Sequence, residues 1–383
     1  MATYLDHAAT TPMRPEAVAA MLPYLSEHFG NPSGSHAMAR SARKAVDDAR
    51  DRVAGGLGCD PSEVIFTGGG TESDNLAVLG AEAASGGSIL CSAVEHHAVL
   101  RAVLRSGRAR DAAVVRVDRA GVIDLDALSE ALHGGVGVVS VMLANNEVGT
   151  IQPVDEVVEI VRDRAPAAVV HTDAIAALPW LDVASAARRA DLISVSAHKF
   201  GGPKGMGVLV VRGGTPLDPI LHGGAQEHGR RPGTHDVAGI VGTAAALSAA
   251  LDGRVTEVAR VRALRDRLAD GLMASVPGLV ETGSSGGEPG DRSGKVAGSC
   301  HLLVPGVDQE ELLLLLDDDG IFASAGAACA SGALEPSHVL LAMGLSEAAA
   351  RTAVRFSLGH TTTAADVDAA LAVVPKVVEK LRR

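Results

Sequence analysis

Aromatic side chains are scarce in this sequence, and negative charge outweighs positive charge. Phe, Trp and Tyr together make up only 2% of the residues, and the formal net charge is −12. Surfaces that bind nucleic acid neutralise phosphates with clustered Lys and Arg, often interleaved with aromatic rings. The chain has no such cluster, so we expect no direct nucleic-acid partner.

Long apolar runs are also missing. The N-terminal Met-Ala-Thr-Tyr-Leu-Asp-His has neither the basic lead nor the apolar stretch that export or a membrane span requires. We therefore expect a cytoplasmic protein that does not associate with a membrane.

Cysteine is rare and widely scattered, at Cys59, Cys91, Cys300 and Cys329. There is no Cys-x-x-Cys pair and no Cys/His spacing that suits zinc. The sequence thus predicts neither a disulfide framework nor a metal site, and it leaves one of the four as a candidate reactive thiol.

A lysine stands at the end of a predicted strand. The apolar, β-branched run at 192–195 predicts a buried strand that breaks into a glycine-rich loop and resumes at 208–211. Lys199 follows this run, after Ser196 and His198. An amine in that place could form a Schiff base with a carbonyl cofactor such as pyridoxal phosphate, whereas the ordinary alternative is a solvated loop lysine.

An acid at a second strand end favours the cofactor site. Asp173 follows the predicted strand at 168–172. A carboxylate beneath the cofactor keeps a pyridine nitrogen protonated, so that the ring can accept electrons from a substrate carbanion. Lys199 and Asp173 together make this chemistry more probable than either does alone.

A glycine-rich turn follows another predicted strand, in the run Glu63 to Asn75. Gly70 and Thr71 lie in that turn, and the spacing of Thr71 and Asp74 is typical of a capping box that opens a helix. Backbone amides at a helix N-terminus bind anions, although many such glycines serve steric needs alone. The Gly-Lys-Ser/Thr ending and the dinucleotide spacing are both absent, so a single phosphate monoester suits the turn best.

Two further strands end in polar residues. His96 follows a strand at 88–91 and could stack on a planar ring or move protons, or simply start a helix. Asn146 follows a strand at 137–143, where it could form a turn or bind polar groups of a cofactor.

The recurring order of strand, polar loop and helix predicts a mainly parallel sheet with helices on both faces, with ligands at the carboxyl ends of its strands. At 383 residues the chain is long enough for two domains.

The C-terminal half adds three candidates. The polar, glycine-rich loop at 221–236 contains Thr234, and its mixture of His, Arg and Thr favours a functional loop over a disordered one. Cys329 lies among small residues without apolar periodicity, which favours a reachable thiol over a small core residue. Arg355, in a strand pattern, could be paired structurally or could bind a substrate carboxylate with its planar fork.

From residue 4 to about residue 363 the sequence resembles the pyridoxal-phosphate cysteine desulfurases of the class V aminotransferase group. The motifs that carry the resemblance, in the family's order, are 4–12, 29–33, 70–75, 95–96, 145–147, 198–199, 233–234, Cys329, 334–337 and 355–359. The Leu-Glu-Pro-Ser at 334–337 is similar to the long-cysteine-loop branch, which feeds iron–sulfur cluster assembly and tRNA thiolation.

The resemblance implies a fold type I transferase. Its large domain, expected at 15–255, would hold a mainly parallel seven-stranded sheet. A smaller α+β domain would comprise 1–14 and 256–383 and would carry the cysteine loop.

The resemblance also implies a role for each candidate. Lys199 would form the Schiff base and move the Cα proton, Asp173 would hold the pyridine nitrogen, and His96 would stack on the ring. The phosphate would be bound at Gly70 by Thr71, Ser196 and His198, with Thr234 supplied by the second subunit of a homodimer. Asn146 and Arg355 would hold the carboxylate of L-cysteine. Cys329 would take its sulfur as a persulfide, leaving alanine, and pass the sulfur to an iron–sulfur scaffold or another acceptor protein.

One position departs from the family pattern. Where the family usually has a glutamine that hydrogen-bonds the phenolic oxygen of the cofactor, this chain has Ala176. The alternatives are therefore a weakly active homologue, another reaction on the same cofactor (a selenocysteine lyase, an epimerase or a β-lyase), or a non-catalytic sulfur-transfer or scaffold protein.

Overall fold

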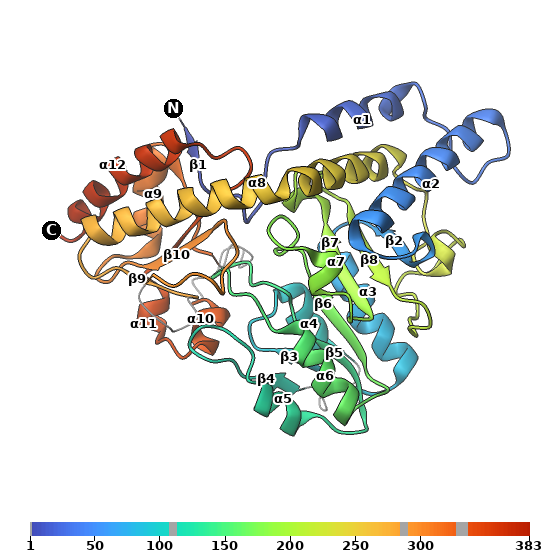
Figure 1. The fold of residues 1–383 in the computed structure, drawn as a ribbon, viewed down its shortest axis with the longest axis horizontal. Coiled ribbons are helices and arrows are strands. Elements are labelled where there is room, and N and C mark those ends of the chain that lie inside the picture. Colours follow the sequence, from blue (N-terminus) through green and yellow to red (C-terminus); the bar gives the residue numbers. More distant parts are fainter. Residues whose placement is uncertain (1, 107–112, 284–289, 327–335) are drawn as a thin grey trace.

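The fold has a large α/β body and a smaller α+β body that share one long helix (Figure 1). It is seen in a computed structural model, which describes residues 2–106, 113–283, 290–326 and 336–383. Cys329 lies outside the described residues.

The large body is built on a seven-stranded sheet with the order β2-β8-β7-β6-β5-β3-β4. β8 pairs antiparallel with both of its neighbours, and the remaining pairs are parallel. The strands are β2 (Val64–Thr67), β3 (Ser88–Ser92), β4 (Ala113–Val115), β5 (Val136–Ser140), β6 (Val169–Asp173), β7 (Leu192–Ser196) and β8 (Gly207–Val211). The predicted mainly parallel sheet is confirmed.

Successive residues of a strand point to opposite sides of the sheet. Both faces of this sheet carry apolar side chains, and helices cover both. In β8, Val208 and Val210 join the cluster on one face, while Leu209 and Val211 join the cluster on the other. The first face packs against α2 (Ala37–Leu57), α6 (Val154–Arg164) and α7 (Val183–Ala186), and the second against α3 (Gly70–Ser85) and α4 (His97–Arg105). α1 (Pro15–Ser26) and α5 (Leu125–Ala131) complete this body.

The small body contains two short sheets. The strands β9 (Val280–Glu281), β10 (Ser299–Leu303) and β12 (Ala353–Ser357) form an antiparallel sheet, and β1 (Thr3–Tyr4) pairs parallel with β11 (Ile321–Phe322). Its helices are α9 (Gln309–Asp318), α10 (His338–Ala342), α11 (Glu347–Ala350) and α12 (Ala364–Leu381).

The long helix α8 (Val237–Ser275) belongs to both bodies. Ile240 and Leu247, in its first half, pack in the core of the large sheet. Leu268 and Leu272, near its end, pack in the core of the small body. The domain boundary expected near residue 255 stays a prediction, because α8 runs through that position without a break.

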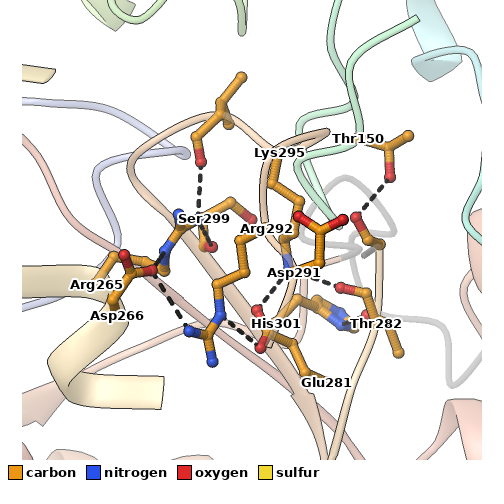
Figure 2. A network of polar contacts seen from close by, with 12 residues as sticks. Thr150, Arg265, Asp266, Glu281, Thr282, Asp291, Arg292, Lys295, Ser299 and His301 are labelled. Carbon is orange, nitrogen blue, oxygen red and sulfur yellow. Dashed lines mark hydrogen bonds and ion pairs between the residues drawn. The ribbon is translucent and has the colours of Figure 1, made fainter. Parts of the chain in front are cut away.

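A buried polar network fastens the small body to the large one (Figure 2). Glu281 of β9 receives ion pairs from Lys295 at 3.0 Å and Arg292 at 2.8 Å. Arg265 of α8 donates to the backbone of the same segment, and Thr150 of the large body donates to the Gly283 carbonyl at 3.4 Å. Because Thr150 closes the turn that contains Asn146, this network helps to fix one wall of the site described next.

None of the helices in the described ranges is long and apolar enough to cross a membrane.

Candidate active site

A cavity of about 370 Å³ lies at the carboxyl ends of the parallel strands. Every strand end that the sequence predicted to be functional contributes to it. Its lining residues include Gly70, Thr71, Asp74, His96, Asn146, Asp173, Ala176, Ser196, His198, Lys199, Gly326 and Arg355.

One end of the cavity is formed by the N-terminus of α3. Gly69, with φ +138°, is the residue before the helix, and no side chain caps the helix there. A Cβ on Gly70 would lie 2.4 Å from Cδ1 of Ile175, so a larger residue there would require the Ile175 side chain to move. The capping box expected from Thr71 and Asp74 was wrong, because Asp74 is buried in the helix and the terminal amides remain open to an anion.

Lys199 lies in a 3-10 turn, Ala197–Lys199, directly after β7. Its Nζ donates hydrogen bonds to the carbonyl oxygens of Ala8 at 2.5 Å and Ala9 at 3.1 Å. The N-terminal segment of the small body therefore holds the amine at the cavity wall.

Asp173 is the last residue of β6 and is 4% exposed. Its Oδ1 accepts the Ile175 amide at 2.8 Å. Burial raises the pKa of this carboxyl, while the Ile175 hydrogen bond and the charge of Lys199 lower it.

Two neutral histidines line the cavity. Burial, and secondly the charge of Lys199, lower the pKa of both His96 and His198 to about 4. His96 precedes α4, and its Nδ1 accepts the Ala98 amide at 3.1 Å, so the ring proton lies on Nε2. His198 is hydrogen-bonded through Nδ1 to Thr10 at 3.2 Å.

Arg355, in the middle of β12, reaches the cavity from the small body and is 2% exposed. Its Nη1 donates to the Asn146 carbonyl at 2.9 Å and to the Gly326 carbonyl at 3.3 Å. The buried Nε has no hydrogen-bond partner among the described residues. Such a donor suits a carboxylate that arrives with the substrate.

One predicted site residue in the described ranges is not brought into this cavity. Thr234 is exposed and is not among the lining residues of the single chain. Cys329 lies outside the described residues, although Gly326, three positions earlier, lines the cavity.

A second cavity, of about 50 Å³, adjoins the first and shares Ala8, Asn146, Ala176 and Lys199 as lining residues. Ala176 therefore stands where the two spaces meet. The short side chain leaves room there that a longer one would fill.

Sequence reasoning missed the burial of Asp74 and the carbonyl groups of Ala8 and Ala9. Asp74 shares the buried face of α3 with Ala77, Val78 and Ala81, a helical spacing that would have indicated burial. Backbone carbonyls leave no comparable signal in the sequence.

Within the described ranges, no group of three or more His, Cys, Asp or Glu is arranged to hold a metal ion.

Comparisons with known proteins cover nearly the whole chain. Residues 3–370 match the family described as Aminotransferase class-V. An IscS-like cysteine desulfurase from Mycobacterium tuberculosis is 45% identical over 99% of this chain and 97% of its own length. A cysteine desulfurase IscS from Methanosarcina thermophila is 41% identical over 100% of this chain and 93% of its own length. A solved NifS-like protein, 33% identical, superposes with a TM-score of 0.91 over 99% of this chain and 100% of that one.

Proposed function

This chain belongs to the class-V aminotransferase family, and on that premise we propose how it works as a pyridoxal-phosphate-dependent cysteine desulfurase. The substrate is L-cysteine, and the products are L-alanine and a sulfur atom carried by the chain. The observation that carries this proposal is one cavity lined by Lys199, Asp173 and Arg355.

The residues present fit pyridoxal phosphate. The open amides at Gly70 and Thr71, with the hydroxyl of Ser196 and the ring of His198, make a donor-rich end for the phosphate. Asp173, at the end of β6, offers the acceptor that a protonated pyridine nitrogen requires.

When bound, the cofactor supplies an electron sink for the substrate carbanion. Lys199 would hold the cofactor through its Nζ and would move the proton at the Cα of cysteine. Asp173 would keep a proton on the ring nitrogen, and neutral His96 would contact the ring.

The substrate carboxylate is bound by Arg355 and by the side chain of Asn146. The unpartnered Nε of Arg355 supports this role, because a buried donor without an acceptor is costly. The thiolate of Cys329 would attack the Sγ of the bound cysteine, forming the sulfur–sulfur bond of a persulfide as the Cβ–Sγ bond breaks. The electron pair of the broken bond would stay with Cβ, which takes up a proton to give alanine. Gly326 supports that step, because it places the start of the cysteine segment at the cavity wall.

A second copy of the chain completes the phosphate end. Thr234 does not line the cavity of its own chain. Exposed apolar residues on and after α1 offer a surface for that copy: Leu22 at 58%, Leu25 at 63% and Phe29 at 72%. The homodimer would thus supply Thr234 to the opposite site.

The persulfide sulfur passes to an acceptor protein. The long-loop motif at 334–337 supports an iron–sulfur scaffold or a tRNA-thiolation partner as the class of acceptor.

The test is to replace Cys329 by Ser in the purified enzyme and to measure alanine, enzyme-bound persulfide and the visible absorbance of the cofactor. Persulfide and alanine should vanish while the absorbance remains. Cys59→Ser is the matched control, since Cys59 is half-buried and its pKa is raised to about 11, chiefly by burial. Unchanged turnover in Cys329→Ser would indicate another reaction on the same cofactor, such as a β-lyase or selenocysteine lyase.

A further inference from the structure

A second carboxyl group lies beside the cofactor site and takes no part in the chemistry described above. Asp74 of α3 is 0% exposed and lines the same cavity as Asp173. Neither of its carboxyl oxygens has a hydrogen-bond partner of ordinary geometry among the described residues. A buried, unpaired carboxylate is among the most costly groups a protein can contain.

The surroundings of Asp74 are acidic. Burial raises its pKa well above the ordinary value, and the charges of Asp173 and Glu95 raise it further, while the nearby Ser194 hydroxyl lowers it. Glu95 is equally buried, and burial raises its own pKa. Neighbouring carboxyl groups that are buried away from water do not all ionise, because their negative charges repel each other. At least one of Asp74, Asp173 and Glu95 therefore keeps its proton.

The proton belongs on Asp74 rather than on Asp173. The Ile175 amide and the charge of Lys199 both favour the ionised form of Asp173. For Asp74 only the Ser194 hydroxyl favours ionisation, and the nearest ring nitrogen, Nε2 of His171, lies 3.7 Å from Oδ1.

A hydrogen-bond chain beside Asp74 agrees with this placement. Burial lowers the pKa of His171 to about 3, so its ring is neutral, with one donor and one acceptor nitrogen. Nε2 of His171 is hydrogen-bonded to Ser194 at 2.9 Å, and Nδ1 to Ser140 at 2.8 Å. When the His171 proton lies on Nδ1, a protonated Asp74 can donate to Ser194, Ser194 to Nε2, and Nδ1 to Ser140. The other tautomer reverses the chain and lets Ser194 donate to an ionised Asp74.

The other titratable or charged groups come from the elements packed against α3 and from the cavity wall. β3 contributes Cys91, and His96 adjoins Glu95 between β3 and α4. α4 itself carries His97, Arg101 and Arg105. His198 and Lys199 follow β7, and Arg355 reaches in from β12. β2, β5 and β8, which also pack against α3, contribute no titratable side chain.

We propose that Asp74 is a positioning residue that keeps one proton on the Asp74–Asp173 pair, so that the pair presents a single negative charge to the ring of the bound cofactor. This inference rests on the proposed function for its meaning, but its first test needs no catalysis. The Asp74 proton prevents a second buried charge and leaves the Asp173 carboxylate to hold the ring nitrogen.

The first test compares the full chain, freed of cofactor, with Asp74→Asn, whose amide mimics the protonated acid. A carboxyl whose folded-state pKa is raised binds more protons folded than unfolded, so it costs stability as pH rises above about 4. Between pH 5 and 8 the unfolding constant of the wild type should therefore rise relative to that of Asp74→Asn, by up to tenfold per pH unit.

The control is Glu82→Gln on the same helix, which should follow the wild type. If Asp74→Asn fails to fold, the unfolding constant of Asp74→Ser is compared with that of the wild type over the same pH range. Identical pH dependence in the wild type and the neutral variant would overturn the proposal.

The second test measures pyridoxal phosphate binding by equilibrium dialysis. Asp74→Asn should bind within about threefold of the wild type, whereas Asp173→Asn should bind at least tenfold more weakly. Equal losses in the two variants would show that the charge of Asp74 is itself required, against the proposal. If the wild type binds no pyridoxal phosphate, the proposed function is wrong, but the pH dependence of unfolding in the first test still decides whether Asp74 carries a proton.

Discussion

Asp6 and Arg355, which lie 349 residues apart in the sequence, form an ion pair in which Oδ1 of Asp6 is 2.7 Å from Nη2 of Arg355. This pair joins the N-terminal segment to β12 and fixes the plane of the guanidinium. With both Nη atoms held, Nε is the buried donor left for a ligand.

Replacing Arg355 by Ala should raise KM for cysteine by about 10- to 100-fold, since a hydrogen bond to a charged group contributes about 1.5–3 kcal/mol. The visible absorbance of the cofactor should remain. Arg355→Lys should restore little, because a point charge cannot replace the planar fork. Steady-state kinetics provide the measurement, and Arg351→Ala, on the neighbouring turn, is the control. A KM unchanged in Arg355→Ala would exclude carboxylate binding by this residue.

Ala176→Gln should return an amide to the place where the two cavities meet. A new hydrogen bond of about 1 kcal/mol to the phenolic oxygen would lower the pH midpoint of the cofactor's absorbance by about 0.7 unit. Turnover should rise with it. A pH titration of the absorbance checks the shift, and Ala176→Leu separates the donor from the added volume. If the Leu variant shifts equally, the amide is not responsible.

Glu227 of the 226–236 loop is held by Arg50 at 2.5 Å and by His235 at 2.7 Å, although its own φ is +48°. Glu227→Gln should lower the free energy of unfolding by about 3 kcal/mol, because it leaves the largely buried Arg50 unpaired. Chemical denaturation is the measurement. Asp48→Asn, which breaks an exposed pair with Lys44, should change little.

The carboxyl of Glu227 also predicts a loss of stability at low pH. Although burial opposes it, hydrogen bonds from His235 and Arg50 hold the pKa of Glu227 down at about 2. A carboxyl with a lowered folded-state pKa stabilises the protein above its unfolded value and loses that contribution as pH falls. Wild-type stability should therefore drop between about pH 4.5 and 2, and Glu227→Gln should lack this part of the drop. Parallel curves for the two proteins would contradict the assignment.

Charges placed on α1 should separate the proposed dimer. Leu22→Glu with Leu25→Glu should weaken self-association at least about 100-fold, since an unpaired buried carboxylate costs about 3 kcal/mol or more. Sedimentation measures the oligomeric state, and cofactor binding should weaken with it if Thr234 comes from the partner. Leu314→Glu, at a 64% exposed site on α9, is the control. A stable dimer in the double variant would exclude α1 from the interface.

The sequence predicted well where chemistry coincides with a strand end. β-branched runs followed by glycine or polar residues located Lys199 and Asp173, because parallel strands all present their carboxyl ends at one edge. Arg355 was a candidate because an arginine is unusual in its strand pattern, and the family order of motifs then assigned it to the substrate carboxylate. The seven-stranded sheet and the smaller α+β body, both implied by the resemblance, are confirmed.

Contacts between distant segments were beyond the sequence. The hydrogen bonds from Lys199 to Ala8 and Ala9 span 191 and 190 residues and use backbone atoms, which every residue has. Asp74 was assigned to a cap because its spacing from Thr71 suits one, but the φ of +138° at Gly69 starts the helix earlier. The cap is therefore two residues earlier than the capping box required, and Asp74 lies on the buried face of the helix.

The uninterrupted helix α8 limits how the two bodies can move. Its 39 residues make a rod about 58 Å long, anchored in the core at each end. A continuous helix resists bending at its middle, so we expect the small body, which carries Arg355, not to move independently of the large one. Cysteine and its product must therefore enter and leave past local segments, with Lys199 and Arg355 already lining one cavity.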